Sequence, residues 1–215
     1  DTAATGLALL AFLGNGDTHV SGPNRRLVQR GLEYLIAKQE LDGDLSRGSR
    51  GTTHIYSHAI ATIALCEALA MTSDDRLREP VRAAVNFLVI AQHPDGGWRY
   101  VPLQPGDASV TGWVIKAMHA AQTADLHVPP KLIVNTKKFL NSLQSGEQYS
   151  YQAGGISKLT MTADATLSRV YLRDAVNTNS VQRGVHFLLE NHTPSLAPHN
   201  LYYLHSATQL MFHHG

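Results

Sequence analysis

The feature that most constrains the fold of this chain is an internal repeat of about fifty residues. An aromatic residue followed by leucine recurs at separations of 53, 52 and 48 residues, as Tyr34-Leu35, Phe87-Leu88, Phe139-Leu140 and Phe187-Leu188. A second column pairs a small or polar residue with glycine or alanine, at Thr5-Gly6, His58-Ala59, Thr111-Gly112, Thr162-Ala163 and Ser206-Ala207. Two unrelated patterns that share nearly one period indicate a repeat array.

Each period contains two segments with helical spacing. One set is amphipathic, at 24–39, 78–92, 130–144 and 180–191. The other set is apolar on all sides and rich in small residues, at 2–13, 56–71, 109–122, 160–173 and 201–213. Helices that are apolar all round are buried, whereas amphipathic helices cover them. The sequence therefore predicts an all-α fold of nine helices with few strands, an αα-toroid (αα-barrel) with inner and outer helices in alternation.

The count of five inner against four outer segments predicts an incomplete ring, since the inner helices at both ends lack part of their cover. We expect residues 1–215 to form a single repeat domain and to be a fragment of a longer protein.

The composition limits the partners of such a domain. At 43% hydrophobic and 16% charged residues the chain is globular, and its formal net charge of +1 gives no sign of a nucleic-acid partner. The longest apolar run, 6–14, has about half the length of a bilayer span, so we expect no transmembrane segment. The single cysteine, Cys66, excludes an intrachain disulfide but leaves the localisation unknown.

The most regular turn follows the segment that carries Arg82, Phe87 and Gln92, with Gly96 and Trp98 at fixed spacing after it. This arrangement resembles, in full, the QW motif of squalene–hopene cyclases and related triterpene cyclases. Most of the chain is similar to bacterial proteins with prenyltransferase and squalene-oxidase repeats. The resemblance implies that Gln92 bonds to the start of a neighbouring helix and that Trp98 stacks on that joint, which is a structural role.

Weaker copies of the motif surround the other glutamines. Gln39 and Gln144 stand at the position of Gln92, and the fourth copy has no tryptophan. Leu45 replaces the tryptophan in the first copy. In the third copy either Tyr149 or Tyr151 is the candidate substitute.

The chemistry of the resembled families is not carried by this sequence. Triterpene cyclases use an Asp-x-Asp-Asp motif as the acid, and no such triplet occurs here. Protein prenyltransferases of the same fold hold zinc with Asp, Cys and His, whereas Cys66 has only Glu67 beside it. The thioester motif of complement-like toroids is also missing. We therefore expect no metal and no cofactor.

Asp164 is the catalytic candidate that remains. It is a lone acid on an otherwise apolar inner segment, and burial without a cation would raise the pKa of its carboxyl and make it a possible proton donor. The structural alternative, which we favour, is a salt bridge to Arg169 or to an outer-helix arginine, or a cap near the helix start. Asp107 before Ser109 is similarly interpreted as a helix N-cap, with a rim position at a cavity mouth as the alternative.

Several aromatic and histidine side chains on the inner segments are candidates for a ligand site. Those we single out for substrate binding are Tyr56, His58, Trp113 and Tyr202. Such rings can line a cavity for an isoprenoid chain or a cation. The alternative is that they belong to the core, as aromatics at these positions usually do.

Three hypotheses for function follow. The first is a binding or interaction module, directed to a peptide, a lipid or another apolar or isoprenoid ligand in a central apolar cavity. The second is an isoprenoid-acting enzyme whose acid is Asp164 or lies outside this chain. The third is a glycan-acting barrel, which would need paired carboxylates that the sequence does not offer. We favour the first.

Overall fold

The structure is a computed structural model that describes residues 1–46, 49, 51–175, 178–191 and 200–214. Within these residues the chain forms nine α-helices, a 3₁₀ turn η1 (Gly51–Thr53) and a hairpin of β1 (Gln144–Ser145) and β2 (Gln148–Tyr149). The helices are α1 (Thr2–Gly14), α2 (Arg25–Lys38), α3 (His54–Thr72), α4 (Asp75–Ile90), α5 (Ala108–Thr123), α6 (Pro130–Leu143), α7 (Leu159–Tyr171), α8 (Asn179–Asn191) and α9 (Leu201–His214). The predicted all-α class is confirmed.

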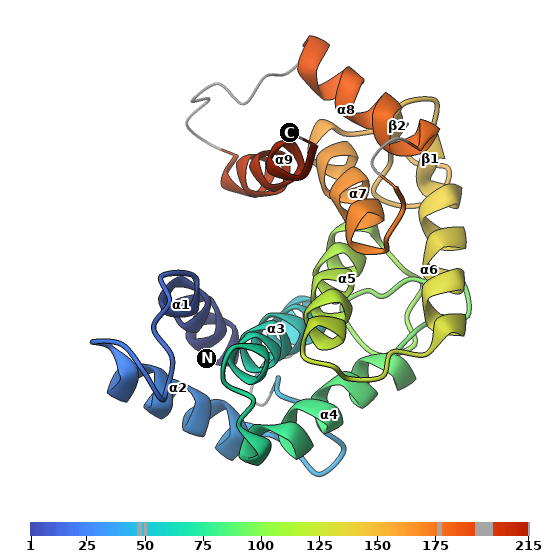
Figure 1. Cartoon of the computed structure of the whole chain (residues 1–215). Coiled ribbons are helices and arrows are strands. Elements are labelled where there is room, and N and C mark those ends of the chain that lie inside the picture. Colours follow the sequence, from blue (N-terminus) through green and yellow to red (C-terminus); the bar gives the residue numbers. More distant parts are fainter. Residues whose placement is uncertain (47–48, 50, 176–177, 192–199, 215) are drawn as a thin grey trace.

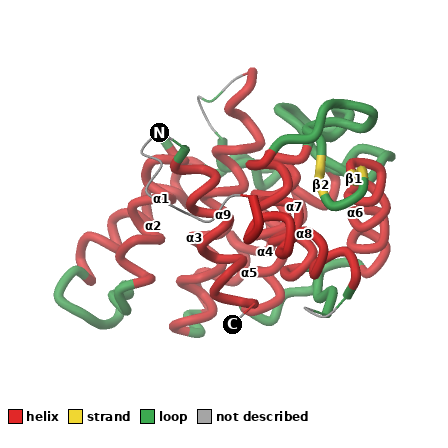
Figure 2. Tube along the Cα trace, turned by 90° about the horizontal axis from the view of Figure 1, so that it is seen from above, coloured by secondary structure: helices red, strands yellow, loops and turns green. Residues whose placement is uncertain are grey.

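The helices alternate between two layers, as the two kinds of segment predicted. The inner layer runs from α1 to α3, α5, α7 and α9, each packed on the next. The helices α2, α4, α6 and α8 lie outside it, and the layers follow an open arc with α1 and α9 facing each other across a gap (Figure 1). From above, the short hairpin is seen at the edge of the molecule beside α6 (Figure 2). The ring is incomplete, as expected.

The inner helices approach one another closely at the small residues of the second column. A Cβ atom added to Gly6 in α1 would lie 3.0 Å from the carbonyl oxygen of Ile60 in α3. By length and composition, Gly51–Thr72 could cross a membrane, yet 72% of its apolar window is buried inside the molecule. This is the burial of a core helix, and the described residues contain no clear transmembrane span.

The outer helices are amphipathic for the predicted reason, because one face covers the inner layer. In α4 the residues Leu77, Val81 and Leu88 are buried, while Arg78 is solvated. This helix begins three residues earlier than predicted. Its N-cap is Asp74, whose side chain accepts a hydrogen bond from the backbone N–H of Arg76 at 3.0 Å.

Each described turn after an outer helix is tied to the next inner helix by the same hydrogen bond. A backbone N–H in the turn donates to the side chain 13 residues later, as Leu45 to His58 Nδ1, Trp98 to Thr111 Oγ1 and Tyr149 to Thr162 Oγ1. The three acceptors are residues of the second sequence column. The pairing also resolves the third motif copy, since Tyr149 and not Tyr151 stands at the tryptophan position.

The motif glutamines link consecutive outer helices. Gln39 Nε2 donates to the carbonyl of Pro80 in α4 at 2.9 Å, and Gln92 Nε2 donates to Thr136 Oγ1 in α6 at 3.0 Å. The resemblance implied a bond to unpaired groups at the helix start, and this detail is corrected. Those unpaired groups are N–H donors. An amide NH₂ is itself a donor, so it bonds oxygens of the helix instead, and Gln92 Nε2 also lies 3.4 Å from the carbonyl oxygen of Leu132 in the first turn of α6.

The motif tryptophan packs at the C-terminal end of the outer helix that precedes it and hydrogen-bonds there. Trp98 is 1% exposed, and its indole N–H donates to the carbonyl of Leu88 at 2.8 Å. Leu88 lies in the last turn of α4, where carbonyls lack helical partners. The turn reaches this position through Gly96, whose φ is +95° and whose added Cβ would lie 2.1 Å from the carbonyl oxygen of Asn135.

The remaining motif residues have separate contacts. Arg82 pairs with Glu79 on the surface of α4, and the Phe87 ring lies 4.5 Å from the ring of His58. Gln144 departs from the other glutamines because it opens the hairpin: its Nε2 donates to Gly146 O at 3.1 Å and its Oε1 accepts from Arg169. The turn of the fourth copy lies outside the described residues.

Candidate functional site

Asp164 is buried between three inner helices. Its side chain in α7 is fully removed from water, and its Oδ1 accepts from Lys116 Nζ in α5 at 2.9 Å. From α9, Tyr202 donates to Oδ2 at 2.8 Å and Ser206 donates to Oδ1 at 3.0 Å. From the sequence, a salt bridge to Arg169 or to an outer-helix arginine, or a cap near the helix start, was expected. A salt bridge is present, but its cation is Lys116 of an inner helix. Arg169 instead bonds Tyr149 and Asn141.

The space for the Asp164 carboxylate is provided by a glycine. A Cβ atom on Gly112 in α5 would lie 2.0 Å from Asp164 Oδ2. Gly112 belongs to the second sequence column, whose small residues were predicted to allow close approach of helix backbones. Here the small residue admits a carboxylate between the helices, where Lys116 neutralises its charge.

Two of the predicted ligand residues belong to a polar network beside Asp164. Tyr56 OH lies 2.6 Å from Ser109 Oγ, which donates to Asp107 Oδ1 at 2.9 Å, while Tyr202 bonds Asp164. Burial raises the pKa of Tyr56 to about 12, so the phenol is neutral at pH 7. Asp107 Oδ1 also accepts from Val110 N–H, which confirms the predicted N-cap of α5.

His58 lies outside any such site. It is fully buried, with Nδ1 accepting from the N–H of Leu45 at 2.9 Å and Nε2 lying 3.0 Å from the carbonyl of Ala84. The second contact requires the Nε2–H tautomer, because a carbonyl can only accept. Both ring nitrogens are therefore occupied by backbone groups, and the residue joins the first motif turn to the second repeat.

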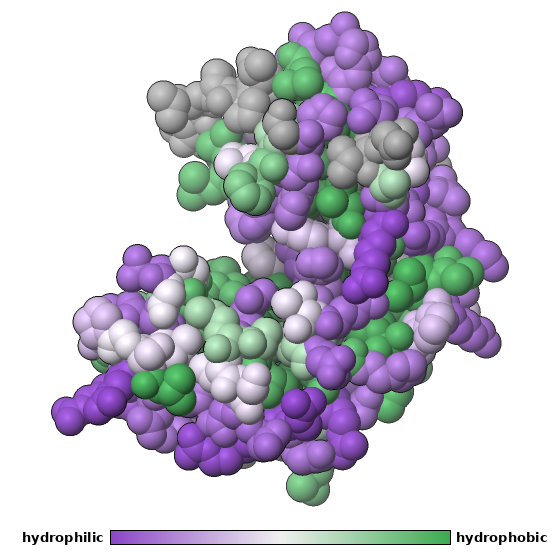
Figure 3. Space-filling model, viewed as in Figure 1, coloured by the Kyte–Doolittle hydropathy of each residue, from purple (hydrophilic) through white to green (hydrophobic). Residues whose placement is uncertain are grey.

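The centre of the arc holds a cavity of about 430 Å³. All five inner helices contribute to it, through Leu10, Ala11, Ile63, Glu67, Trp113, Lys116, His119, Tyr171, His205 and Gln209. The surface is hollowed between the α1 and α9 ends of the arc (Figure 3). A volume in this range is typical of small-molecule sites. Half of the lining side chains are polar or charged, so the cavity is amphipathic and less apolar than the sequence indicated.

The aromatic walls of the cavity are in contact with its other side chains. The Trp113 ring stacks on His205 with centroids 5.8 Å apart, and Lys116 Nζ lies 4.9 Å from the centre of the Trp113 ring. On another wall the rings of His119 and Tyr171 have centroids 4.7 Å apart. Trp113 is thus the predicted ligand residue that the structure places in the cavity.

Among the ionisable groups that line the cavity, Glu67 is the carboxyl group without an ion-pair partner in the described part of the chain. Burial lowers the pKa of His119, and burial together with the charge of Lys116 lowers that of His205, so both rings are neutral at pH 7. Lys116 is paired with Asp164. Burial raises the pKa of Glu67, and this side chain forms no ion pair within the described part of the chain.

Lys116 and Gln209 were not predicted from the sequence, and Glu67 was identified there only as a neighbour of Cys66. A signal for Lys116 was available in the repeat. Leu10, Ile63 and Lys116 are spaced by 53 residues, and all three line the cavity. Asp164 follows the second column as Trp113 does, yet it is not among the lining residues.

No group of three metal-ligating side chains occurs among the described residues. Cys66 is fully buried, and burial raises the pKa of its thiol far above the ordinary value, which keeps it protonated.

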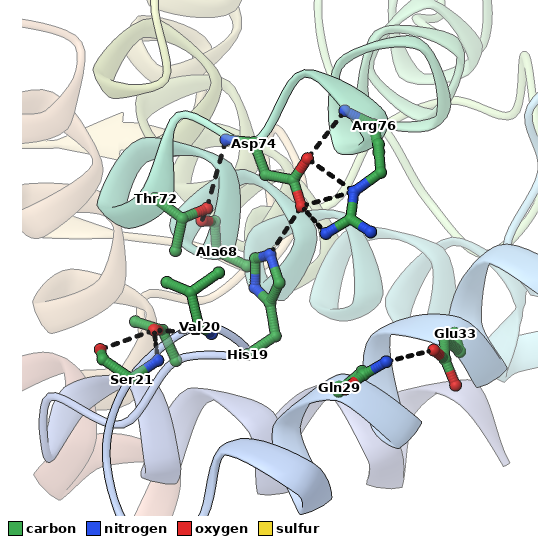
Figure 4. A network of polar contacts seen from close by, with 10 residues as sticks. His19, Val20, Ser21, Gln29, Glu33, Ala68, Thr72, Asp74 and Arg76 are labelled. Atoms are coloured by element: carbon green, nitrogen blue, oxygen red, sulfur yellow. Dashed lines mark hydrogen bonds and ion pairs between the residues drawn. The ribbon is translucent and has the colours of Figure 1, made fainter.

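A second polar cluster lies where the loop after α1 meets α4 (Figure 4). His19 Nε2 lies 2.9 Å from Asp74 Oδ2, and Arg76 Nη2 lies 2.7 Å from the same oxygen. Hydrogen bonds from Arg76 and then His19 lower the pKa of Asp74. The adjoining cavity is only about 140 Å³, and Asp74 is the N-cap of α4, so the cluster is explained by capping and by attachment of the loop.

Comparison with known proteins agrees with this geometry. The model of the squalene-hopene cyclase C-terminal domain matches residues 1–138. The chain is also similar to drimenyl diphosphate synthase from Streptomyces showdoensis, with 35% identity over 100 residues. That alignment covers 46% of this chain and only 18% of the relative. Because the family model spans more than half of the chain, from α1 into α6, the protein belongs to the squalene-hopene cyclase C-terminal domain family.

Proposed function

We propose that this domain binds an amphipathic small molecule in its central cavity and does not use Asp164 as a catalytic acid. The observation that carries the proposal is the environment of Asp164. A general acid for an alkene must be protonated and must reach the substrate. Asp164 instead accepts hydrogen bonds from Lys116, Tyr202 and Ser206, one of them from a cation, and lies outside the cavity lining.

The cavity itself supports a binding role. Its volume of about 430 Å³ suits a drug-sized ligand, and it combines aromatic rings with a few polar groups, which is the usual composition of such sites. Trp113 and Tyr171 offer apolar faces, and Glu67 and Gln209 offer polar ends. A ligand with an apolar body and one polar group would match this lining.

A second candidate function is an isoprenoid-acting enzyme whose acid is Asp164 or lies outside this chain. It is favoured by the similarity to a protein named drimenyl diphosphate synthase. Since the similarity covers 18% of that relative, the activity of the whole relative reaches this chain only as a hypothesis.

Product analysis separates the two functions. The protein is incubated with squalene and, separately, with a prenyl diphosphate, and the organic extracts are examined for cyclised products. We expect none from the wild type. A cyclised product that disappears in Asp164→Asn would overturn the proposal and make Asp164 catalytic.

Ligand binding is tested separately with a neutral apolar fluorescent probe, N-phenyl-1-naphthylamine. Trp113→Ala should weaken its binding by roughly tenfold, because the variant removes one aromatic wall of the cavity. The control is Val134→Ala, which alters an exposed side chain of α6 and should leave the affinity unchanged. Equal affinities in the two variants would show that the probe binds elsewhere.

A further inference from the structure

Glu67 is the one carboxyl group in the described lining of the central cavity, and no described side chain forms an ion pair with it. Its helix α3 presents it to a cavity whose basic side chains are Lys116, His119 and His205. The lysine is held by Asp164 at 2.9 Å, and the two histidines are neutral at pH 7. A half-buried carboxylate without a cation costs free energy, which a positively charged ligand would offset.

The walls beside this carboxylate suit the same kind of ligand. Trp113 and Tyr171 present π systems to the cavity, and aromatic faces attract organic cations. The Trp113 ring already attracts one cation, since Lys116 Nζ lies 4.9 Å from its centre. Aliphatic contacts are available from Leu10 and Ile63.

The lining disfavours an anionic ligand. A phosphate or carboxylate group needs a free cation or several N–H donors directed at it. Lys116 is the one strongly basic side chain in the described lining, and its charge is neutralised by Asp164. An anion would also be repelled by Glu67.

We propose that the ligand of the central cavity is an organic cation, a protonated amine or a quaternary ammonium on an apolar group, whose charge pairs with Glu67. This inference rests on the proposed binding function and adds the chemical class of the ligand. It also assigns Glu67 as the residue that selects for positive charge.

Three probes with one apolar group in common test the inference. Octyltrimethylammonium, 1-octanol and octyl phosphate are titrated into the protein at pH 7 and followed by calorimetry. We expect the ammonium to bind about tenfold more tightly than octanol, because the ion pair and the aromatic contacts add to the same burial of the octyl chain. Octyl phosphate should bind more weakly than octanol.

Variants then assign the preference to Glu67. Glu67→Gln should remove the tenfold preference for the ammonium over octanol, and Glu67→Asp should retain part of that preference. Glu147→Gln, a control in the turn of the β-hairpin, should behave as the wild type. Retention of the full preference in Glu67→Gln would contradict the assignment of Glu67.

The affinities of the wild type for the three probes also test the inference without any variant. Equal affinity for the ammonium and octanol, or tightest binding of octyl phosphate, would overturn the inference while leaving the binding function in place. Absence of binding by all three probes would overturn both. The wild-type ranking remains decisive even if Glu67→Gln does not fold.

Discussion

Lys116 Nζ lies 2.9 Å from Asp164 Oδ1, and neither side chain is more than 9% exposed. The pair joins α5 to α7, and Tyr202 and Ser206 extend it to α9. Burying two charges costs desolvation free energy, which is offset only by their mutual attraction and by additional hydrogen bonds. The acid that resembled a catalytic group in the sequence is therefore, in the structure, part of a joint between three inner helices.

Removing one partner of this joint should cost more than removing both. Lys116→Met leaves Asp164 buried with its charge uncompensated, and we expect a loss of roughly 3–5 kcal/mol in the free energy of unfolding. The double variant Lys116→Met/Asp164→Asn should recover a large part of that loss. Urea denaturation at pH 7 measures both. A Lys116→Met variant with the wild-type midpoint would show that the pair does not hold the helices together.

Trp98→Ala should destabilise the protein by roughly 3–5 kcal/mol, because the side chain is 1% exposed and its removal leaves a cavity. Trp98→Phe is the matched control. It keeps most of the packing and loses the indole N–H bond to the Leu88 carbonyl, so it should cost about 1–3 kcal/mol. The urea midpoints of the two variants and the wild type give the comparison. Equal midpoints for Trp98→Ala and the wild type would exclude a role for Trp98 in holding the repeats together.

Much of this architecture could be predicted because its causes repeat along the chain. The period of about fifty residues specified the two layers, and the second column marked where inner helices meet. The hydrogen bond by which this column holds the preceding turn, as between Thr111 and Trp98, could not be predicted. It depends on the distance in space between two residues 13 apart in the sequence. The ends of single helices were predicted less well. Helix α4, capped by Asp74, begins a few residues before the predicted start, because caps depend on local geometry.

The candidate site was harder to predict because its residues do not repeat. Lys116 stands in a register occupied by Leu10 and Ile63, so the period marks the position and gives no reason for a charge. The pairing of Lys116 with Asp164 joins residues 48 apart on different helices. Which of Tyr56, His58, Trp113 and Tyr202 faces the cavity depends on helix rotation, which the pattern of apolar residues fixes only within about one position.

The free energy of unfolding should fall at acidic pH, in part because of Asp44. Burial opposes its ionised form, yet hydrogen bonds from His54 Nε2 at 2.8 Å and from Ser46 outweigh that effect and hold the pKa of Asp44 far below its ordinary value. Because the pKa of Asp44 is lower in the folded state than in the unfolded state, its ionised form stabilises the fold at any pH above the unfolded-state pKa. That stabilisation is lost as the pH falls from the unfolded-state pKa towards the folded-state pKa.

Asp44→Asn should therefore cost roughly 1.5–3 kcal/mol at pH 7. The difference from the wild type should stay constant down to about pH 5 and shrink below about pH 4. Urea titrations at several pH values measure it. Asp42→Asn is the control, because Asp42 lies in the same turn and is exposed, and its difference should stay small throughout. A difference for Asp44→Asn that grows towards low pH would have the wrong sign.

Gly112→Ala tests whether the carboxylate of Asp164 needs the space left by glycine. The new Cβ would lie 2.0 Å from Asp164 Oδ2, so we expect a loss of roughly 1–3 kcal/mol from overpacking. In a helix interior alanine is otherwise better than glycine by about 1 kcal/mol. In the background Lys116→Met/Asp164→Ala, where the carboxylate is gone, the same substitution should therefore become neutral or stabilising. Gly14→Ala, with no atom within 4 Å of the added Cβ, should be nearly neutral in both backgrounds. If Gly112→Ala costs the same in both backgrounds, the glycine serves the helix packing alone and not the buried carboxylate.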